Sequence, residues 1–261
     1  MSEHWKRNVA GKTVLITGAG RGIGAATARY FAKGGANLLL VGKSPANIER
    51  LAEEINAGGG KALAVQCDVA KFDDVQRAVD TCLAEFGSLD VLINNAGIID
   101  PIATLEESDP AAWGYAGDVN YKGVYHGIKV AIGPMKKQRG GIIINLSSGA
   151  ANSILEGWSH YCSNKAASKK LTEIANQELG RYGIRVIGIS PGTVATDMMH
   201  SIKASAINPV SRLDWNSHIP VDWVAKAIAF LCGDEGQLYV GTDFSIKTPE
   251  GRALVGLPEH V

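Results

Sequence analysis

The stretch that decides the fold is Thr13-Val14-Leu15-Ile16-Thr17-Gly18-Ala19-Gly20-Arg21-Gly22-Ile23-Gly24. Its first five residues are an apolar run suited to a buried parallel strand. The glycines that follow permit unusual backbone dihedrals and close approach of a ligand, and residues 25–33 continue as a helical pattern. A strand, a glycine turn and a helix in this order form a phosphate site, because the helix N-terminus faces the ligand. The stretch therefore predicts nucleotide binding.

Strand-like and helix-like segments alternate along the rest of the chain. The further strands expected cover residues 36–41, 61–66, 91–93, 141–146, 184–189 and 239–246. The further helices expected cover residues 45–55, 75–83, 113–135, 161–181 and 221–232. This alternation predicts a single α/β domain over residues 1–261, a Rossmann-type doubly wound parallel sheet of about seven strands with helices on both faces.

Composition and charge exclude several classes of partner. The 26 Lys and Arg balance the 26 Asp and Glu, so no basic field favours nucleic acid or an anionic membrane. Residues 1–12 are polar and charged, and no window supplies the ~18 apolar residues of a membrane span. The four cysteines show no metal-ligand spacing and are expected to be reduced core thiols, with no metal site. We expect a cytoplasmic protein.

Polar residues are expected to gather where strands end. Asn94-Asn95-Ala96-Gly97 follows the fourth strand, and Ser147 and Ser148 follow the fifth. Ligands of doubly wound sheets bind at this carboxyl edge. A further pair, Tyr161 and Lys165, is spaced to share one face of a helix. A cation beside a phenol stabilises the phenolate and lowers the tyrosine pKa, which makes acid–base catalysis possible, although most such pairs are merely an exposed helix face.

With these residues laid out, the chain closely resembles the short-chain dehydrogenase/reductase family over nearly all of its length. The family's T-G-x-x-x-G-x-G corresponds to residues 17–24, and its N-N-A-G to residues 94–97. Its Y-x-x-x-K corresponds to residues 161–165, and its P-G-x-V-x-T to residues 191–196. The segment 245–251 departs from the V-D-G-G-like sequence that often follows the family's last strand, which puts a C-terminal subunit contact in doubt.

The resemblance implies four catalytic residues: Asn120, Ser148, Tyr161 and Lys165. Tyr161 would be the general acid or base, and Ser148, with Ser147 as the alternative, would hold the carbonyl oxygen. Lys165 would lower the Tyr161 pKa and bind the nicotinamide ribose. Asn120 would hold a water that links Lys165 to solvent. Its alternative reading is a helix-distorting side chain bonded to backbone.

The resemblance also implies that a nicotinamide dinucleotide is held by the motifs and by the ends of the second and third strands. These contacts are Gly18, Gly20, Arg21, Gly22, Ile23, Gly24, Lys43, Ser44, Asp68, Val69, Asn94, Ala96, Gly97, Tyr161, Lys165, Pro191, Gly192, Val194 and Thr196. Folds that choose NAD usually carry an acid about 20 residues after the glycine turn. Here that place is Gly42, followed by Lys43, so NADP(H) is favoured and NAD(H) is possible. Arg21 could reach the same 2′-phosphate.

The segment 193–220 is irregular, with one possible helix, and its length is typical of a lid over a substrate. Together with residues 98–102 and 150–159 it would enclose a small-molecule carbonyl or alcohol substrate. The expected pocket residues are Leu155, Trp158, Met198, Met199 and Trp215. They suggest an apolar or aromatic ketone, although the same side chains could simply cover the core.

Other functions stay open at this stage. Lys203 and Arg212 keep a 3-oxoacyl thioester (acyl-carrier-protein) reductase possible, and a dinucleotide-sensing regulator without turnover is a further alternative. A sugar epimerase would need a longer C-terminal domain, and enoyl reductases space Tyr and Lys more widely. By analogy with the family, a homodimer or homotetramer is expected, built on helices 113–135 and 161–181.

Overall fold

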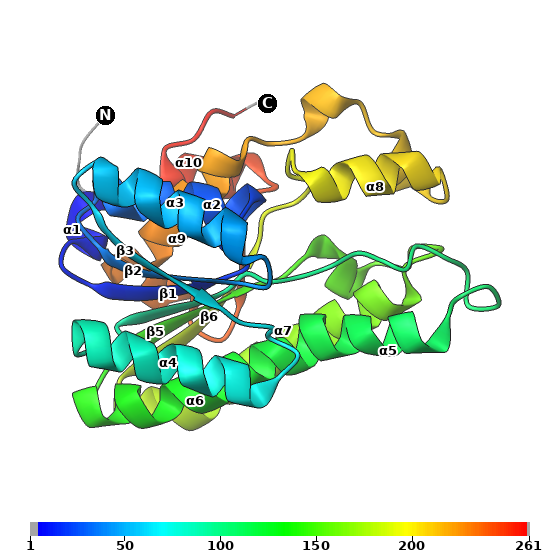
Figure 1. Cartoon of the computed structure of the whole chain (residues 1–261). Helices are drawn as coiled ribbons and strands as arrows, with labels where there is room; N and C mark the ends of the chain where they lie inside the picture. Colours follow the sequence, from blue (N-terminus) through cyan, green and yellow to red (C-terminus); the bar gives the residue numbers. More distant parts are fainter. Residues whose placement is uncertain (1–4, 260–261) are drawn as a thin grey trace.

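The computed structural model describes residues 5–259, which form three layers, with one sheet between two layers of helices (Figure 1). Within these residues the sheet has seven strands in the order β3-β2-β1-β4-β5-β6-β7, and all neighbouring strands are parallel. Their bounds are β1 Thr13–Thr17, β2 Asn37–Gly42, β3 Lys61–Gln66, β4 Val91–Asn94, β5 Gly141–Leu146, β6 Ile184–Ser190 and β7 Asp243–Ser245. The predicted doubly wound α/β fold is confirmed.

Helices cover both faces of the sheet (Figure 1). One face is covered by α2 (Gly22–Lys33), α3 (Pro45–Ala57) and α9 (Val221–Leu231), and the short α1 (Lys6–Val9) and α10 (Pro249–Val255) lie on the same side. The other face is covered by α4 (Phe72–Phe86), α5 (Pro110–Gly117), α6 (Gly123–Gln138) and α7 (Ser159–Leu179). The helix α8 (Asp197–Ser205) lies apart from these layers, beyond the carboxyl ends of the strands.

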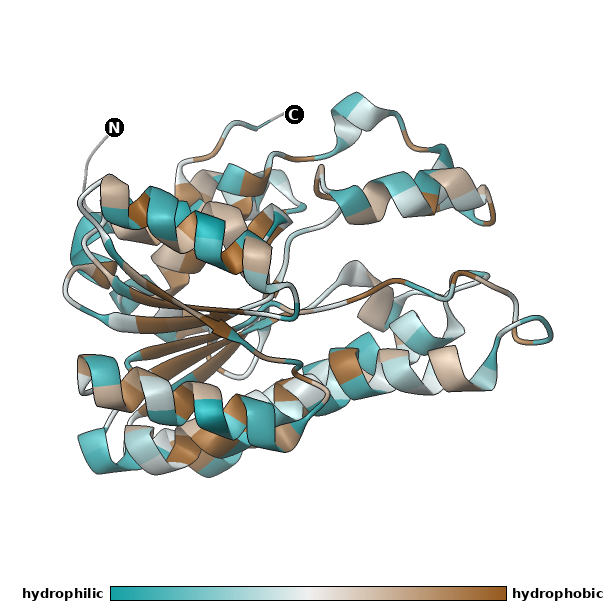
Figure 2. Cartoon of the chain, viewed as in Figure 1, coloured by the Kyte–Doolittle hydropathy of each residue, from teal (hydrophilic) through white to brown (hydrophobic). Residues whose placement is uncertain are grey.

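Alternating residues of each strand fill two apolar cores. On β1, Val14 and Ile16 belong to the core under α2, α3 and α9, whereas Leu15 belongs to the core under α4 and α6. Because both faces of a parallel sheet are buried, the strands read as continuous apolar runs. Figure 2 shows the resulting brown sheet between helices whose outer surfaces are largely teal. Among the described residues, no helix is long and apolar enough to cross a membrane.

Two predicted elements differ from the structure. The last strand covers only Asp243–Ser245, and residues 234–239 form a 3-10 turn. Gly241, with a φ of 69°, turns the chain between them, so the predicted strand 239–246 is too long. The predicted helix 113–135 runs from Pro110 to Gln138 but contains a π-helical turn, Asp118–Lys122, between α5 and α6.

The sheet order places the site. Strand β1 lies between β2 and β4, so successive strands leave β1 in opposite directions and a crevice opens at its carboxyl end. The glycine turn, the N-N-A-G segment and both serines follow strands that end at this edge.

Candidate active site

The glycine turn between β1 and α2 follows a backbone path that favours glycine. Gly18 and Gly22 have φ angles of 63° and 53°, in the region that residues with a side chain rarely adopt. A Cβ atom on Gly24 would overlap the Gly18 carbonyl oxygen, so the start of α2 lies directly against the end of β1. The Asn95 side chain fixes this contact by donating to the carbonyl oxygens of Thr17 and Gly18 at 2.8 and 3.1 Å.

The N-terminus of α2 suits an anion. In the described part of the chain no side chain caps it, and its first turn carries no acidic residue, so its backbone N–H groups can serve a ligand. Together with the close approach of strand and helix, this arrangement fits the diphosphate of a dinucleotide. Arg21 precedes the helix and pairs with Asp197 of α8 at 3.3 Å.

The other predicted cofactor contacts lie along the same edge of the sheet. Lys43 and Ser44 follow β2, and Asp68 and Val69 follow β3. The remaining residues are Asn94, at the end of β4, Ala96 and Gly97, which follow it, and Pro191, Gly192, Val194 and Thr196, which follow β6. Gly20 and Ile23 belong to the glycine turn and the first turn of α2. The fold therefore brings all of them to one rim.

Tyr161 and Lys165 lie one turn apart on α7, and both are buried, with 9% and 4% of their surface exposed. The Tyr161 phenol is hydrogen-bonded to the side chain of Ser148, which follows β5. The Lys165 ammonium lies 5.7 Å from the centre of the Tyr161 ring and donates to the Leu146 carbonyl oxygen at 2.6 Å. Three of the predicted catalytic side chains therefore meet at the carboxyl end of β5.

Burial controls the ionisation of this pair. It raises the pKa of Tyr161 to about 12, while the hydrogen bond with Ser148 acts in the opposite direction. It lowers the pKa of Lys165 to about 8, while the negative charge of Asp243 acts in the opposite direction. Burial thus dominates both pKa values, because it disfavours the charged form of each group, and the lowering of the Tyr161 pKa by Lys165 stays a prediction.

Ser147 and Ser148 are adjacent in sequence but have different partners. Ser147 is buried, and its hydroxyl donates to Asp243 Oδ2 at 2.6 Å. Asp243 lies on β7 and reaches past Gly188 of β6, where a Cβ atom would overlap its carboxylate. Ser147 is therefore tied to the edge of the sheet, and Ser148 is the serine beside Tyr161.

Asn120 lies in the π-helical turn and is fully buried. Its side-chain amide donates to the Ile98 carbonyl oxygen and accepts from the Ile98 N–H, both at 2.8 Å. Its backbone carbonyl oxygen accepts from Ser168 Oγ of α7 at 2.9 Å. The side chain thus holds the segment after N-N-A-G, and the backbone carbonyl faces α7.

The five residues predicted to line the substrate pocket lie in one apolar cluster with Tyr161. Trp158 and Met199 are buried in this cluster, and the partly buried side chains packed against it include Leu155, Met198 and Trp215. The Trp158 ring meets the Tyr161 ring edge-on, with 5.6 Å between their centres. The apolar surface therefore begins beside the phenol.

The segment between β6 and α9 starts and ends at one place. Val194 and Ile219 form an isolated parallel bridge, and the Ala195 N–H donates to the Ile219 carbonyl oxygen at 3.0 Å. The Asn208 side chain donates to the Glu156 carbonyl oxygen at 3.0 Å, which holds the segment on the neighbouring loop. Between the bridged residues lie α8 and the 3-10 turns Pro209–Arg212 and Trp215–Ser217.

This geometry agrees with a family match over most of the chain. The family model described as short chain dehydrogenase matches residues 12–206. The chain belongs to the short-chain dehydrogenase family. As a member it is an oxidoreductase of the class that acts on CH–OH and C=O groups.

Relatives match almost end to end. The cis-4-hydroxycyclohexanecarboxylate dehydrogenase of Sinomonas cyclohexanicum is 36% identical over 248 residues, which cover 91% of this chain and 95% of the relative. The 3-oxoacyl-(acyl-carrier-protein) reductase FabG of Staphylococcus aureus (strain Mu50 / ATCC 700699) is 35% identical over 245 residues, which cover 90% and 96%. A solved 7α-hydroxysteroid dehydrogenase, complexed with NADH and 7-oxo glycochenodeoxycholic acid, has a TM-score of 0.85 at 28% identity and covers 94% and 96%.

Three buried polar residues of this short-chain dehydrogenase, Asn145, Thr172 and His160, were missed by sequence reasoning. Asn94 donates to Asn145 at 2.8 Å, and Asn145 donates to Thr172 of α7 at 2.9 Å. A ring nitrogen of His160 lies 2.6 Å from the Ile99 carbonyl oxygen. Asn145 within an otherwise apolar strand was the available signal, because a buried polar side chain there needs a partner.

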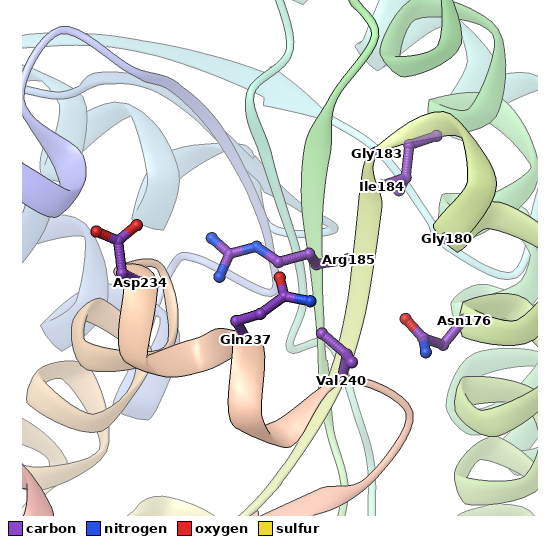
Figure 3. A pocket seen from close by; sticks show the side chains of 8 residues that line it. All are labelled: Asn176, Gly180, Gly183, Ile184, Arg185, Asp234, Gln237 and Val240. Atoms are coloured by element: carbon purple, nitrogen blue, oxygen red, sulfur yellow. The ribbon is translucent and has the colours of Figure 1, made fainter.

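A hollow of about 620 Å³ lies at the opposite, amino edge of the sheet (Figure 3). Its lining includes Arg185 and Asn176, whose polar groups already serve the fold. Arg185 donates to the Gly233 and Cys232 carbonyl oxygens at 2.7 and 3.2 Å, and Asn176 accepts from the Val186 N–H at 3.3 Å. This hollow in the short-chain dehydrogenase is therefore separate from the Tyr161 site.

The cysteines of this short-chain dehydrogenase are all free. Cys67, Cys82 and Cys232 are buried, as expected of core thiols, whereas Cys162 is only half-buried. Across the described residues, no group of three or more His, Cys, Asp or Glu side chains could hold a metal ion.

Proposed function

We propose that this short-chain dehydrogenase moves a hydride between a nicotinamide cofactor and a ketone or secondary alcohol. The observation that carries the proposal is that Ser148, Tyr161 and Lys165 meet at one rim with the glycine turn. A nicotinamide held at this rim would supply the hydride in reduction and accept it in oxidation. Tyr161 gives its proton to the carbonyl oxygen in reduction and takes one from the alcohol in oxidation. Ser148 donates a hydrogen bond to that oxygen and stabilises its developing charge.

Lys165 and Asn120 would support the proton transfer. Burial lowers the pKa of Lys165 to about 8, so its ammonium can lose and regain a proton close to neutral pH. Lys165 would also bind the nicotinamide ribose. The Asn120 carbonyl, which faces α7, would hold a water that connects Lys165 with solvent.

The proposed cofactor is NADP(H), with NAD(H) as a possible alternative. The end of β2 supports this choice, because a Cβ atom on Gly42 would stand 2.9 Å from Ile48 Cγ2. Tight packing on α3 therefore opposes an acidic side chain at the position where NAD-binding folds usually carry one. Lys43 follows and offers a cation to a 2′-phosphate. The exposed Arg21 offers a second cation, although it forms an ion pair with Asp197 in this structure.

The proposed substrate is an apolar or aromatic ketone, or the matching secondary alcohol. The apolar cluster around Tyr161 supports it. A relative named for cis-4-hydroxycyclohexanecarboxylate and a neighbour solved with 7-oxo glycochenodeoxycholic acid are consistent with it. The alternative substrate is a 3-oxoacyl thioester. The similarity to the FabG relative and the exposed cations Lys203 and Arg212 favour this alternative.

A panel of ketones, alcohols and 3-oxoacyl thioesters, offered with each cofactor, tests the proposal. Turnover is followed by the absorbance of the reduced nicotinamide, and Tyr161→Phe is the matched inactive control. We expect turnover of at least one apolar ketone. Turnover of thioesters alone would favour the alternative substrate. Tight cofactor binding with no turnover across the panel would favour a dinucleotide-sensing regulator.

The proposal also includes the domain organisation, the oligomeric state and the cellular compartment of the protein. Residues 1–261 would act as one domain, in which 193–220 is a substrate lid. The chain would be a homodimer or homotetramer, as the family resemblance implies. The free cysteines fit a reducing compartment such as the cytoplasm.

A further inference from the structure

Three side chains from separate elements meet where the adenosine end of the cofactor is proposed to bind. Lys43 follows β2, Asp68 follows β3 and Tyr115 lies on α5. The Lys43 ammonium donates to the Tyr115 hydroxyl at 2.8 Å, and that hydroxyl donates to Asp68 Oδ2 at 3.2 Å. The ammonium also pairs with Asp68 Oδ2 at 3.4 Å. The phenol therefore stands between a cation and a carboxylate.

Tyr115 connects an exposed side chain to one that is largely buried. The Lys43 side chain is 70% exposed, whereas that of Asp68 is only 15% exposed. Asp68 Oδ1 accepts from the Ala70 N–H at 3.1 Å, which holds the carboxylate in the turn after β3. The Tyr115 ring packs against the apolar core under α4 and α6. An exposed lysine loses side-chain entropy when a ligand holds it in one place. Because the hydrogen bond to the half-buried Tyr115 already restrains Lys43, ligand binding would cost less side-chain entropy.

Lys43 is a cation at neutral pH, and its contacts with Tyr115 and Asp68 act in the same direction. The hydrogen bond to Tyr115 is the largest cause that raises the pKa of Lys43, and the charges of Tyr115 and Asp68 act in the same direction. Of the three N–H donors of a lysine, two are directed to Tyr115 and Asp68. The third remains for an anion.

We propose that Tyr115 is a specificity-determining residue for the cofactor, because its phenol holds the Lys43 ammonium in the position that a 2′-phosphate requires. This inference rests on the proposed preference for NADP(H). It extends that preference to a residue on α5 that belongs to none of the motifs.

Direct binding tests the proposal without a known substrate. Calorimetric titration of NADP+ and NAD+ is carried out on the parent, Tyr115→Phe, Lys43→Ala and the double variant. We expect Tyr115→Phe to weaken NADP+ binding by about three- to tenfold, the range for one net hydrogen bond, and to change NAD+ binding by less than about twofold. In the Lys43→Ala background the same change should leave the ratio of the two affinities unaltered, because both residues act on one contact.

A matched control is Tyr121→Phe, which removes the hydroxyl of a tyrosine that is 39% exposed on the next stretch of the same helix. It should bind both cofactors like the parent. Thermal unfolding of each variant shows whether it is folded. Adenosine 2′,5′-bisphosphate and 5′-AMP serve as probes of the adenosine end alone, and only the first should respond to Tyr115→Phe.

The outcomes separate this inference from the cofactor preference. If Lys43→Ala lowers the ratio of NADP+ to NAD+ affinity but Tyr115→Phe does not, the preference stands and the role of Tyr115 is overturned. If Tyr115→Phe strengthens NADP+ binding, the contact with Tyr115 keeps Lys43 away from the phosphate, and the inference is again overturned. If the parent binds NAD+ at least as tightly as NADP+, the proposed preference fails, and with it the inference that rests on it.

Discussion

At the scale of single residues, the Tyr161 hydroxyl is the group on which the proposed chemistry depends most. Tyr161→Phe should lower kcat by at least about 10²-fold, the lower range for loss of general acid–base catalysis. The ring would still fill its place in the apolar cluster, so cofactor affinity should stay close to that of the parent. Fluorescence titration of the cofactor beside turnover measures both quantities. Near-normal turnover in the variant would remove Tyr161 from the mechanism.

The neighbouring serines provide a pair of variants with opposite consequences. Ser148→Ala should lower kcat/KM by about 10²- to 10³-fold, as expected when a donor to a developing oxyanion is lost, and should unfold like the parent. Ser147→Ala removes the donor to Asp243 at 2.6 Å and should lower the unfolding free energy by about 1–3 kcal/mol, with kcat/KM within about tenfold of the parent. Urea denaturation and steady-state kinetics measure the two effects. If the effects are exchanged, Ser147 is the serine that holds the substrate oxygen.

Lys165 should give the stability of the protein a distinct dependence on pH. Its folded pKa is lowered from 10.5 to about 8, so between these values the unfolded chain binds more protons and the unfolding free energy rises with pH. Lys165→Met lacks this rise. The unfolding free energy of the variant minus that of the parent should therefore fall by roughly 1–2 kcal/mol between about pH 8 and pH 9.5.

Urea denaturation across this pH range, which ends below the ordinary pKa of tyrosine, measures the difference. Lys170→Met, an exposed position on the same helix, is the control and should keep the rise seen in the parent. A pH-independent difference for Lys165→Met would mean that the buried ammonium titrates at its ordinary pKa. Lys165→Met should also weaken cofactor binding, which Tyr161→Phe should not.

At the scale of elements, the segment 193–220 is the one expected to move. Lys203 and Arg212 are exposed on it and offer cleavage sites for trypsin. We expect cofactor plus a substrate analogue to slow cleavage at both sites, because the closed lid would be held over the bound molecules. Asn208→Ala removes the hydrogen bond to the Glu156 carbonyl and should speed cleavage of the ligand-free protein. Equal cleavage rates with and without ligands would contradict a lid.

The elements also show which features a sequence reveals. The glycine turn and the rim motifs were predictable, because their apolar runs and punctuating glycines are local signals. The π-helical turn was not, because residues 118–122 read as ordinary helix, and the bonds that Asn120 makes with Ile98 and Ser168 join parts of the chain that are distant in sequence. The last predicted strand, residues 239–246, is too long because its strand-like sequence pattern continues through the turn that the chain makes at Gly241.

Contacts between distant parts of the chain were the least predictable. Ser147 meets Asp243 across 96 positions, and Lys43 meets Tyr115 across 72. The raised Tyr161 pKa also escaped prediction, because burial depends on the whole core, whereas the spacing of two residues shows only their mutual charge effect.

At the scale of the whole molecule, we expect the proposed self-association to use α6 and α7. Tyr125 and Ile174 on these helices are each 47% exposed, and they would become part of an interface if they belong to one apolar patch. Light scattering coupled to size exclusion should give the mass of a dimer or tetramer, and Tyr125→Lys should shift it toward a smaller species. Leu105→Lys, on a loop residue that is 75% exposed, is the control and should leave the mass unchanged. A monomeric parent would contradict the oligomer expected from the family.

The Val194–Ile219 bridge would make the proposed lid, residues 193–220, an exchangeable unit of the fold. Both of its ends are fastened at one point, and lengthening a closed loop adds little entropic cost. Insertions, deletions or a different lid sequence could therefore be accommodated between Val194 and Ile219, while the carboxyl edge of the sheet and Tyr161 stay where they are. Selection can then change which molecules are admitted without changing how they react.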